Sequence, residues 1–147
     1  MKERSYVMVK PEFANSKFVI EEVRRRLESA GLKIEQADYI NYDADHAKQH
    51  YAEHVGKGFY PELEAYITSD KAYGMIVVGE NAIATIRGLV GSTKNPVKGT
   101  IRYDVPVIMN LPLRVTENVV HASDSVDSAK REIAIFEDLV DTATKSL

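Results

Sequence analysis

The sequence has no cysteine, no apolar run of membrane-spanning length and no strong excess of charge of either sign. Without cysteine the chain can form no disulfide bond, thiolate nucleophile or thiolate metal site, so packing alone must stabilise the fold. Because it also lacks an apolar signal region after Met1, we expect no membrane contact and a cytoplasmic location. The net charge of −3 argues against a general nucleic-acid-binding surface.

The chain has the length and composition of one globular domain. Its 147 residues are 44% hydrophobic and 28% charged, which are proportions typical of a protein with one buried core. Neither a low-complexity segment nor a Pro- or Ser-rich linker divides the chain. We therefore expect a single domain over residues 1–147.

Apolar patterning predicts both strands and helices. Short β-rich segments predict strands at residues 5–10, 32–42, 72–79 and 119–121. Helical periodicity and capping residues predict helices over 17–30, after Asp43, over 61–69, over 82–90, and after Asp124 or Ser125. This order favours an α+β fold, a ferredoxin-like antiparallel four-stranded sheet with helices packed on one face.

The segment over residues 92–117 breaks the pattern. It contains prolines at 96, 106 and 112 and no sustained periodicity, so we expect a long loop. A loop of this length in a compact domain usually serves a function or moves.

His121 is the first candidate for a catalytic side chain. It ends an apolar run directly before a helix cap, where a neutral imidazole could act as a nucleophile. Glu132 lies two turns into the following helix and could fix which ring nitrogen is free. A structural hydrogen bond is the alternative role for a lone histidine at a strand end.

Several cationic and hydroxyl side chains stand at the ends of predicted elements, namely Lys10, Arg87, Thr93 and Arg102. If they converge, they would hold a polyphosphate, although each alone would be an ordinary solvated residue. The sequence has neither a P-loop nor a dinucleotide fingerprint, so phosphate binding must use another device.

A metal site is a competing interpretation for three other histidines. His46, His50 and His54 recur at four-residue spacing and could share one helix face. We favour this interpretation less, because a three-His face drifts around the helix and has no carboxylate partner.

Six segments, in order, resemble the motif series of nucleoside diphosphate kinases. They are VMVKPE at 7–12, HYAEH at 50–54, GFYPEL at 58–63, IRGLVGSTKNP at 86–96, GTIRYD at 99–104 and NVVHASDSVDSAKREI at 118–133. The similarity spans residues 3 to 137, and the last segment is the strongest single signal. It implies that His121 takes the γ-phosphoryl group of a nucleoside triphosphate and passes it to a nucleoside diphosphate.

The resemblance also implies roles for the residues around His121. Ser123 and Glu132 would orient its ring, and Tyr51 would lie beside it near the transferred group. Lys10 would contact the γ-phosphate and the ribose 3′-hydroxyl.

The remaining implied roles concern the nucleotide and its metal ion. Arg87, Thr93 and Arg102 would hold the terminal phosphates, and Asn118 would bind the ribose 3′-hydroxyl. Phe59 would stack on the base, with Leu63 and Val115 packed near it. Asp124 would lie close to the Mg²⁺ that the nucleotide carries.

The segments also depart from the family pattern. Glu12 stands where aspartate is usual, and Lys94 separates Thr93 from the following Asn-Pro. The stretch over 96–99 is shorter than usual, and the stretch over 102–118 is longer. The loop normally helps to build the nucleotide pocket and the subunit contacts.

Two other functions compete with the kinase. One is a catalytically weak relative that binds nucleotides as a regulatory or assembly module, and the other is a bare ferredoxin-like binding domain. The set of matched site residues favours the enzyme, because a binding module needs no nucleophile. The resemblance further implies nucleoside tri- and diphosphates as ligands and a homo-oligomer, either a hexamer or a tetramer.

Overall fold

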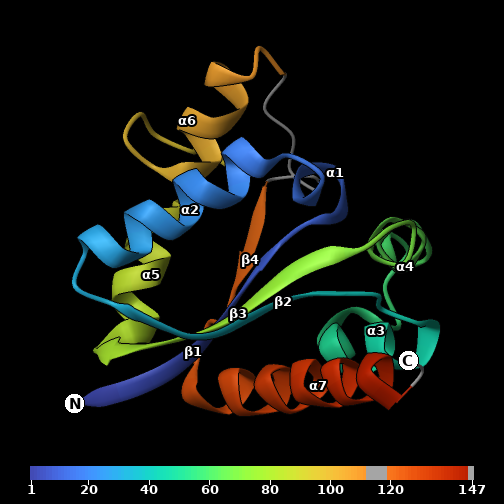
Figure 1. Ribbon diagram of the computed structural model, residues 1–147. Coiled ribbons are helices and arrows are strands. Elements are labelled where there is room, and N and C mark those ends of the chain that lie inside the picture. The colour runs from blue at the N-terminus through green and yellow to red at the C-terminus, as the bar shows by residue number, and fades with distance from the viewer. Residues whose placement is uncertain (112–118, 146–147) are drawn as a thin grey trace.

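A four-stranded antiparallel sheet organises the computed structural model, which describes residues 1–111 and 119–145 (Figure 1). The strands are β1 Lys2–Val9, β2 Lys33–Ile40, β3 Ala72–Glu80 and β4 Val120–Ala122. Their order across the sheet is β2-β3-β1-β4, and all three pairings are antiparallel. The predicted ferredoxin-like α+β fold is confirmed, with β1 in a central position.

Helical elements connect and follow the strands. They are α1 Pro11–Ala14, α2 Lys17–Ser29, α3 Ala44–His50, the 3₁₀ turn η1 Ala52–His54, α4 Tyr60–Ile67, α5 Ala82–Val90, α6 Ile101–Ile108 and α7 Val126–Lys145. The side chains of Ser16 and Asp43 accept the cap hydrogen bonds of α2 and α3. Ser125, rather than Asp124, accepts the Ser128 N–H at the start of α7. Every helix among the described residues is too short or too polar to span a bilayer.

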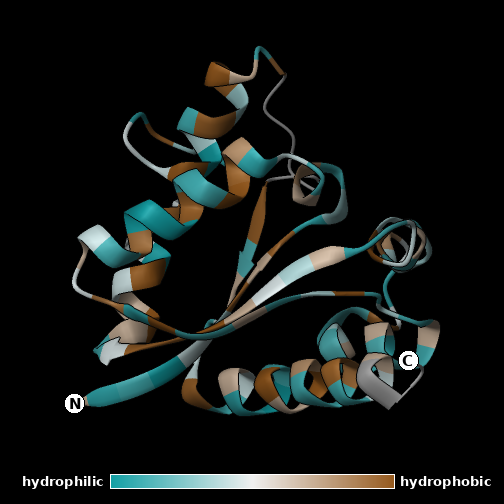
Figure 2. Ribbon diagram, viewed as in Figure 1, coloured by the Kyte–Doolittle hydropathy of each residue, from teal (hydrophilic) through white to brown (hydrophobic). Residues whose placement is uncertain are grey.

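Helices cover both faces of the sheet, so the expectation of helices on one face is wrong (Figure 1). On one face Val7 and Val9 pack in a core cluster with residues of α2 and α5. On the other face Tyr6 and Met8 pack with residues of α7. Residues 5–9 of β1 are all buried, because alternate side chains enter two different cores. The apolar and polar residues that alternate along α7 are those of a helix with one buried face (Figure 2).

The predicted loop over 92–117 contains a helix. In α6, Ile101 and Val105 are fully buried one turn apart, although Pro106 stands inside the helix. The three prolines led us to predict a loop here, because proline usually interrupts helical hydrogen bonding. Gly91 ends α5 with a φ of 90°, and a Cβ there would meet the Thr100 side chain at 2.6 Å, so the chain before α6 needs glycine at this position.

His46 joins α3 to α7 through two carboxylates. Its Nδ1 lies 2.7 Å from Asp43 Oδ2, and its Nε2 lies 2.6 Å from Asp138 Oδ2. Both ring nitrogens can donate only when the imidazole is protonated. Burial opposes the charged form, but the hydrogen bonds to Asp138 and Asp43 outweigh it and raise the pKa of His46 above 6.5. This contact ties the second half of α7, where no sequence pattern predicted a helix after Asp138, to α3.

The His46→Gln variant should therefore lose stability in a pH-dependent way. Because the folded pKa is raised, the contribution is complete below pH 6.5 and disappears as pH rises through the folded pKa. Both carboxylates are mostly exposed, so we expect a difference of about 1 kcal/mol or less. Urea denaturation of both proteins from pH 5.5 to 9 measures it, and Asp138→Asn should show the same trend. A difference that stays constant with pH would contradict the ion-pair account.

Candidate active site

One cavity of about 650 Å³ gathers most of the predicted site residues. Its volume lies in the range of pockets that bind small molecules. Around His121 it is lined by Lys10, Tyr51, Arg87, Arg102, Asp124 and Glu132. Phe59, Leu63 and Thr93 also line it. The structure thus brings together residues that lie more than a hundred positions apart in the sequence.

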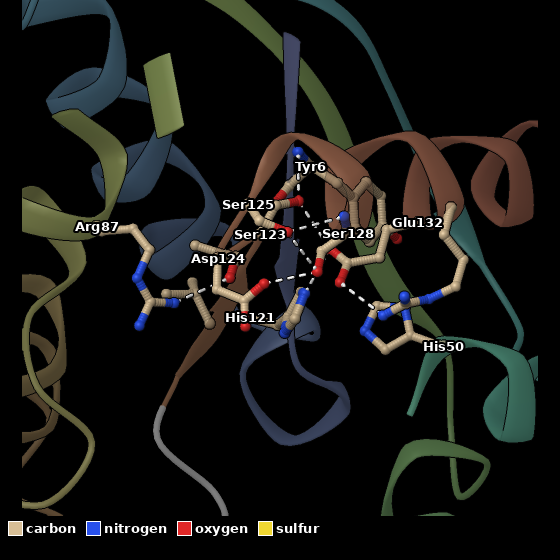
Figure 3. A network of polar contacts seen from close by, with 12 residues as sticks. Tyr6, His50, Arg87, His121, Ser123, Asp124, Ser125, Ser128 and Glu132 are labelled. Atoms are coloured by element: carbon tan, nitrogen blue, oxygen red, sulfur yellow. Dashed lines mark hydrogen bonds and ion pairs between the residues drawn. The ribbon is translucent and has the colours of Figure 1, made fainter. Parts of the chain in front are cut away.

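A buried hydrogen-bond chain holds the His121 ring (Figure 3). His121 is the middle residue of β4, and its Nε2 lies 2.7 Å from Oε1 of Glu132, which α7 supplies. The Ser123 hydroxyl donates to the same oxygen at 2.7 Å and accepts the Tyr6 N–H at 3.1 Å. Both Ser123 and Glu132 are buried. The structure therefore places these two residues where they can orient the imidazole.

The surroundings of His121 keep its ring neutral. Burial, together with the positive charges of Lys10, Arg102 and Arg87, lowers the pKa of His121 to about 3. In the neutral ring Nε2–H donates to Glu132, so Nδ1 carries the free lone pair. No described residue hydrogen-bonds to Nδ1, and one-fifth of the side chain is exposed in the cavity. The arrangement presents an unprotonated imidazole nitrogen as a nucleophile near neutral pH.

Backbone carbonyls fix two arginines of the cavity, Arg87 and Arg102. Arg102 is buried, and its guanidinium donates to the carbonyls of Gly91 at 2.7 Å and Val120 at 3.0 Å. Burial and nearby Arg87 lower the pKa of Arg102 to about 10, which still leaves it charged at neutral pH. Arg87 donates to the Ala122 carbonyl at 3.3 Å. These anchors hold both guanidinium groups next to β4, where anionic oxygens would be stabilised.

Lys10 is more deeply placed than its position in the sequence suggested. Lys10 follows β1 directly, lines the cavity and is only 7% exposed. Its backbone N–H donates to the Val119 carbonyl, which ties the end of β1 to the start of β4. Its charge therefore acts on His121 from inside the protein.

An aromatic side chain stands exposed in the same cavity. Phe59 directly precedes α4 and is 51% exposed, with the His54 ring 5.4 Å away between centroids. Leu63 lies one turn further along α4 and is mostly buried. An exposed flat ring of this kind can stack on a nucleobase. Tyr51 is mostly buried, with its ring centroid 6.3 Å from that of His121.

Two of the remaining predicted site residues line the cavity, and two lie outside the described residues. Asp124 lines the cavity, and its Oδ1 accepts the Ser128 hydroxyl at 2.6 Å. Thr93 lies in the loop after α5 and also lines the cavity. Val115 and Asn118 lie outside the described residues, so their roles stay predictions.

Two residues at the site were not predicted as parts of it. The His50 ring lies 4.5 Å from that of His121 between centroids, and Arg131 Nη2 lies 3.9 Å from Glu132 Oε2. The only signals were the position of His50 beside Tyr51 and of Arg131 beside Glu132. Among the described residues the three-histidine metal site does not form, since the group of ligand atoms close enough to share an ion is His50, His121 and Glu132.

Comparison with known proteins agrees with the fold. The family model described as nucleoside diphosphate kinase matches residues 3–139. A nucleoside diphosphate kinase of Listeria monocytogenes is 43% identical over 137 residues, which cover 91% of this chain and 88% of that protein. One of Methanobrevibacter smithii is 42% identical over 139 residues, with 92% and 87% covered.

Solved structures give the same result. The nucleoside diphosphate kinase of Halobacterium salinarum, solved in complex with CDP, aligns with a TM-score of 0.82 at 35% identity, covering 92% of this chain and 88% of that one. The Aquifex aeolicus enzyme aligns with a TM-score of 0.80 at 26% identity, covering 92% and 95%. The chain belongs to the nucleoside diphosphate kinase family.

Proposed function

We propose that the chain moves the γ-phosphoryl group of a nucleoside triphosphate to a nucleoside diphosphate through a phosphohistidine at His121. Its class, a phosphotransferase of the nucleoside diphosphate kinase type, follows from the family. The observation that carries the proposed mechanism is the hydrogen bond from His121 Nε2 to Glu132. This bond leaves Nδ1 as the nucleophile in a cavity where Lys10, Arg87 and Arg102 supply positive charge.

The reaction takes two balanced displacements. In the first, the lone pair of Nδ1 attacks the γ-phosphorus, the P–O bond to the β-phosphate breaks, and the diphosphate leaves with the bonding electrons. In the second, a β-phosphate oxygen of another diphosphate attacks the phosphorus, and the N–P bond returns its electrons to Nδ1. Glu132 keeps accepting the Nε2–H, which stabilises the positive charge that the ring gains in the first step.

Charge stabilisation supplies most of the catalysis in this proposal. Phosphoryl transfer has a loose transition state whose charge spreads over the oxygens, so fixed cations lower its free energy. Lys10, Arg87 and Arg102 line the cavity beside His121, and Thr93 can add a hydroxyl donor. Stacking on Phe59 reads no base edge, so one pocket can accept different nucleotides.

Mg²⁺ fits the donors at this site. It prefers oxygen ligands and usually stays bound to substrate phosphates with several waters. Asp124 lies exposed at the cavity. The hydrogen bond from Ser128 lowers the pKa of its carboxyl, so the group is ionised. Asp124 would hold the ion of the incoming nucleotide, and that ion would neutralise phosphate charge.

The homo-oligomer, whether a hexamer or a tetramer, also belongs to this proposal. Val107 and Ile108 on α6 are more than half exposed, and β2 is an edge of the sheet. Surfaces of both kinds commonly pair between subunits. Sedimentation analysis gives the number of subunits. The cytoplasmic location stays a prediction.

Transfer of a labelled phosphate tests the mechanism. Incubation with ATP labelled in the γ-phosphate should leave acid-labile, base-stable label on the protein, and added GDP should remove it as labelled GTP. The nucleotide-binding module remains the second candidate, but it gives no reason for the orienting chain of Ser123 and Glu132. Tight nucleotide binding by wild-type protein that never takes up label would establish the module instead.

A further inference from the structure

The cluster of His50, His121 and Glu132 is a ligand set that the phosphoryl-transfer mechanism does not need in full. One ring nitrogen of each histidine and one oxygen of Glu132 all lie within 4.8 Å of one another. The three side chains come from α3, β4 and α7, so the fold itself brings them together. Figure 3 shows the His50 ring beside Glu132, on the side of His121 opposite Arg87 in this view.

His50 has a buried ring nitrogen without a hydrogen-bond partner among the described residues. The residue is only 2% exposed, and its Nε2 has no hydrogen-bond partner in the part of the chain that the structure describes, while its Nδ1 lies 3.5 Å from the Tyr42 hydroxyl. A buried polar atom without a partner costs free energy, and native structures contain few of them. His50 thus offers a nitrogen lone pair to a ligand that can share it.

We propose that His50, His121 and Glu132 bind a zinc ion, or a transition metal ion of similar chemistry, that inhibits the enzyme. Two neutral imidazoles and one carboxylate form a ligand set that occurs in zinc sites with a fourth, open position. The cavity supplies water for that position. Mg²⁺ does not compete, because it prefers oxygen ligands and gives up its water reluctantly.

The distances allow the ion to enter with small movements. Ligands about 2.0–2.2 Å from a tetrahedral zinc ion lie roughly 3–3.5 Å from one another. The 2.7 Å contact between His121 Nε2 and Glu132 Oε1 must therefore widen slightly. The other distances between ligand atoms, which are at most 4.8 Å, must shorten where they exceed this range.

Inhibition follows from the place the ion takes. Zinc bonds to Nε2 in place of its proton, which is released to water, and the hydrogen bond to Glu132 is lost. The dication draws electron density from the ring, so Nδ1 becomes a weaker nucleophile. This half of the inference rests on the proposed function of His121, whereas the binding half rests on the geometry alone.

Zinc binding is tested with ZnCl₂ and metal-free protein by equilibrium dialysis and calorimetry near neutral pH. We expect one ion per chain, with release of protons on binding. The His50→Phe variant keeps an aromatic ring among the packed side chains and removes both nitrogens. It should lower the zinc affinity by about 100-fold or more, since loss of an outer-shell partner alone costs up to that much.

His54→Ala is the matched control, because His54 lines the same cavity outside the cluster. It should bind zinc as tightly as wild type does. An absence of zinc binding at micromolar concentrations, or equal affinity in wild type and His50→Phe, would overturn the proposed site. If His50→Phe does not fold, as judged by circular dichroism, His50→Gln replaces it and the same affinities decide.

The inhibition is measured on the same proteins. Zinc at saturation should slow labelling by γ-labelled ATP in wild type and in His54→Ala, with much less effect on His50→Phe relative to its own zinc-free rate. Zinc that is bound by the cluster without slowing the labelling would contradict the inhibition. Wild type that takes up no label without zinc would contradict the proposed function instead, and the dialysis result would still decide the binding site.

Discussion

The His121→Ala variant should lose phosphoryl transfer by roughly 10⁴-fold or more, because it lacks the nitrogen that forms the covalent bond. The label from γ-labelled ATP should be absent from the variant under conditions in which wild type is fully labelled. Nucleotide binding should persist, since Phe59 and the cations of the cavity remain in place. Steady-state turnover, labelling and nucleotide affinity are measured on the same preparation.

The fold should survive this change. His121 pairs with Met8 through the backbone of β4, and that pairing does not involve the imidazole. His54→Ala removes a different histidine of the same cavity and should still take up label. A labelled His121→Ala variant would show that the phosphate is carried by another residue.

The Lys10→Gln variant should have the second largest effect. Removing one fixed charge that stabilises the transition state typically costs about 10²–10³-fold in rate. The pKa of His121 should rise in the variant, because the charge of Lys10 contributes to its low value. Since this lysine is buried, its neutral replacement removes a charge from the interior, and we expect stability to change much less than activity.

Lys94→Gln is the control for Lys10. Lys94 also lines the cavity, but it stands exposed in the loop after α5. A solvated lysine contributes little, so turnover should fall only slightly in this variant. Turnover and melting temperature that fall in proportion in Lys10→Gln would mean that the lysine supports the fold rather than the reaction.

Local signals predicted the elements that local interactions define. The limits of α5 agree with the prediction, because Gly91 marks its end by a backbone angle that favours glycine. Asp43 likewise caps α3 as predicted. The sequence did not predict that helices pack on both faces of the sheet. A buried strand such as β1 is simply apolar throughout, and this pattern does not show which elements pack on each face.

In the predicted site, too, contacts between residues close in the sequence could be predicted, and contacts that depend on distant elements could not. His121 and Glu132 lie eleven residues apart around a helix start, so their contact could be proposed from the sequence. Whether Arg102 reaches β4 depends on α6, which the prolines concealed. His50 was known only as one of three regularly spaced histidines, because nothing local tells which of them packs against β4.

The position of the phosphate on the His121 ring tests the account most directly. The hydrogen bond of Nε2 to Glu132 predicts that the phosphate is attached to Nδ1. Nitrogen–proton correlation spectra of the ¹⁵N-labelled phosphoenzyme distinguish the two ring positions. A phosphate on Nδ1 of His121 is the expected result, and a phosphate on Nε2 or on any other residue would contradict the mechanism.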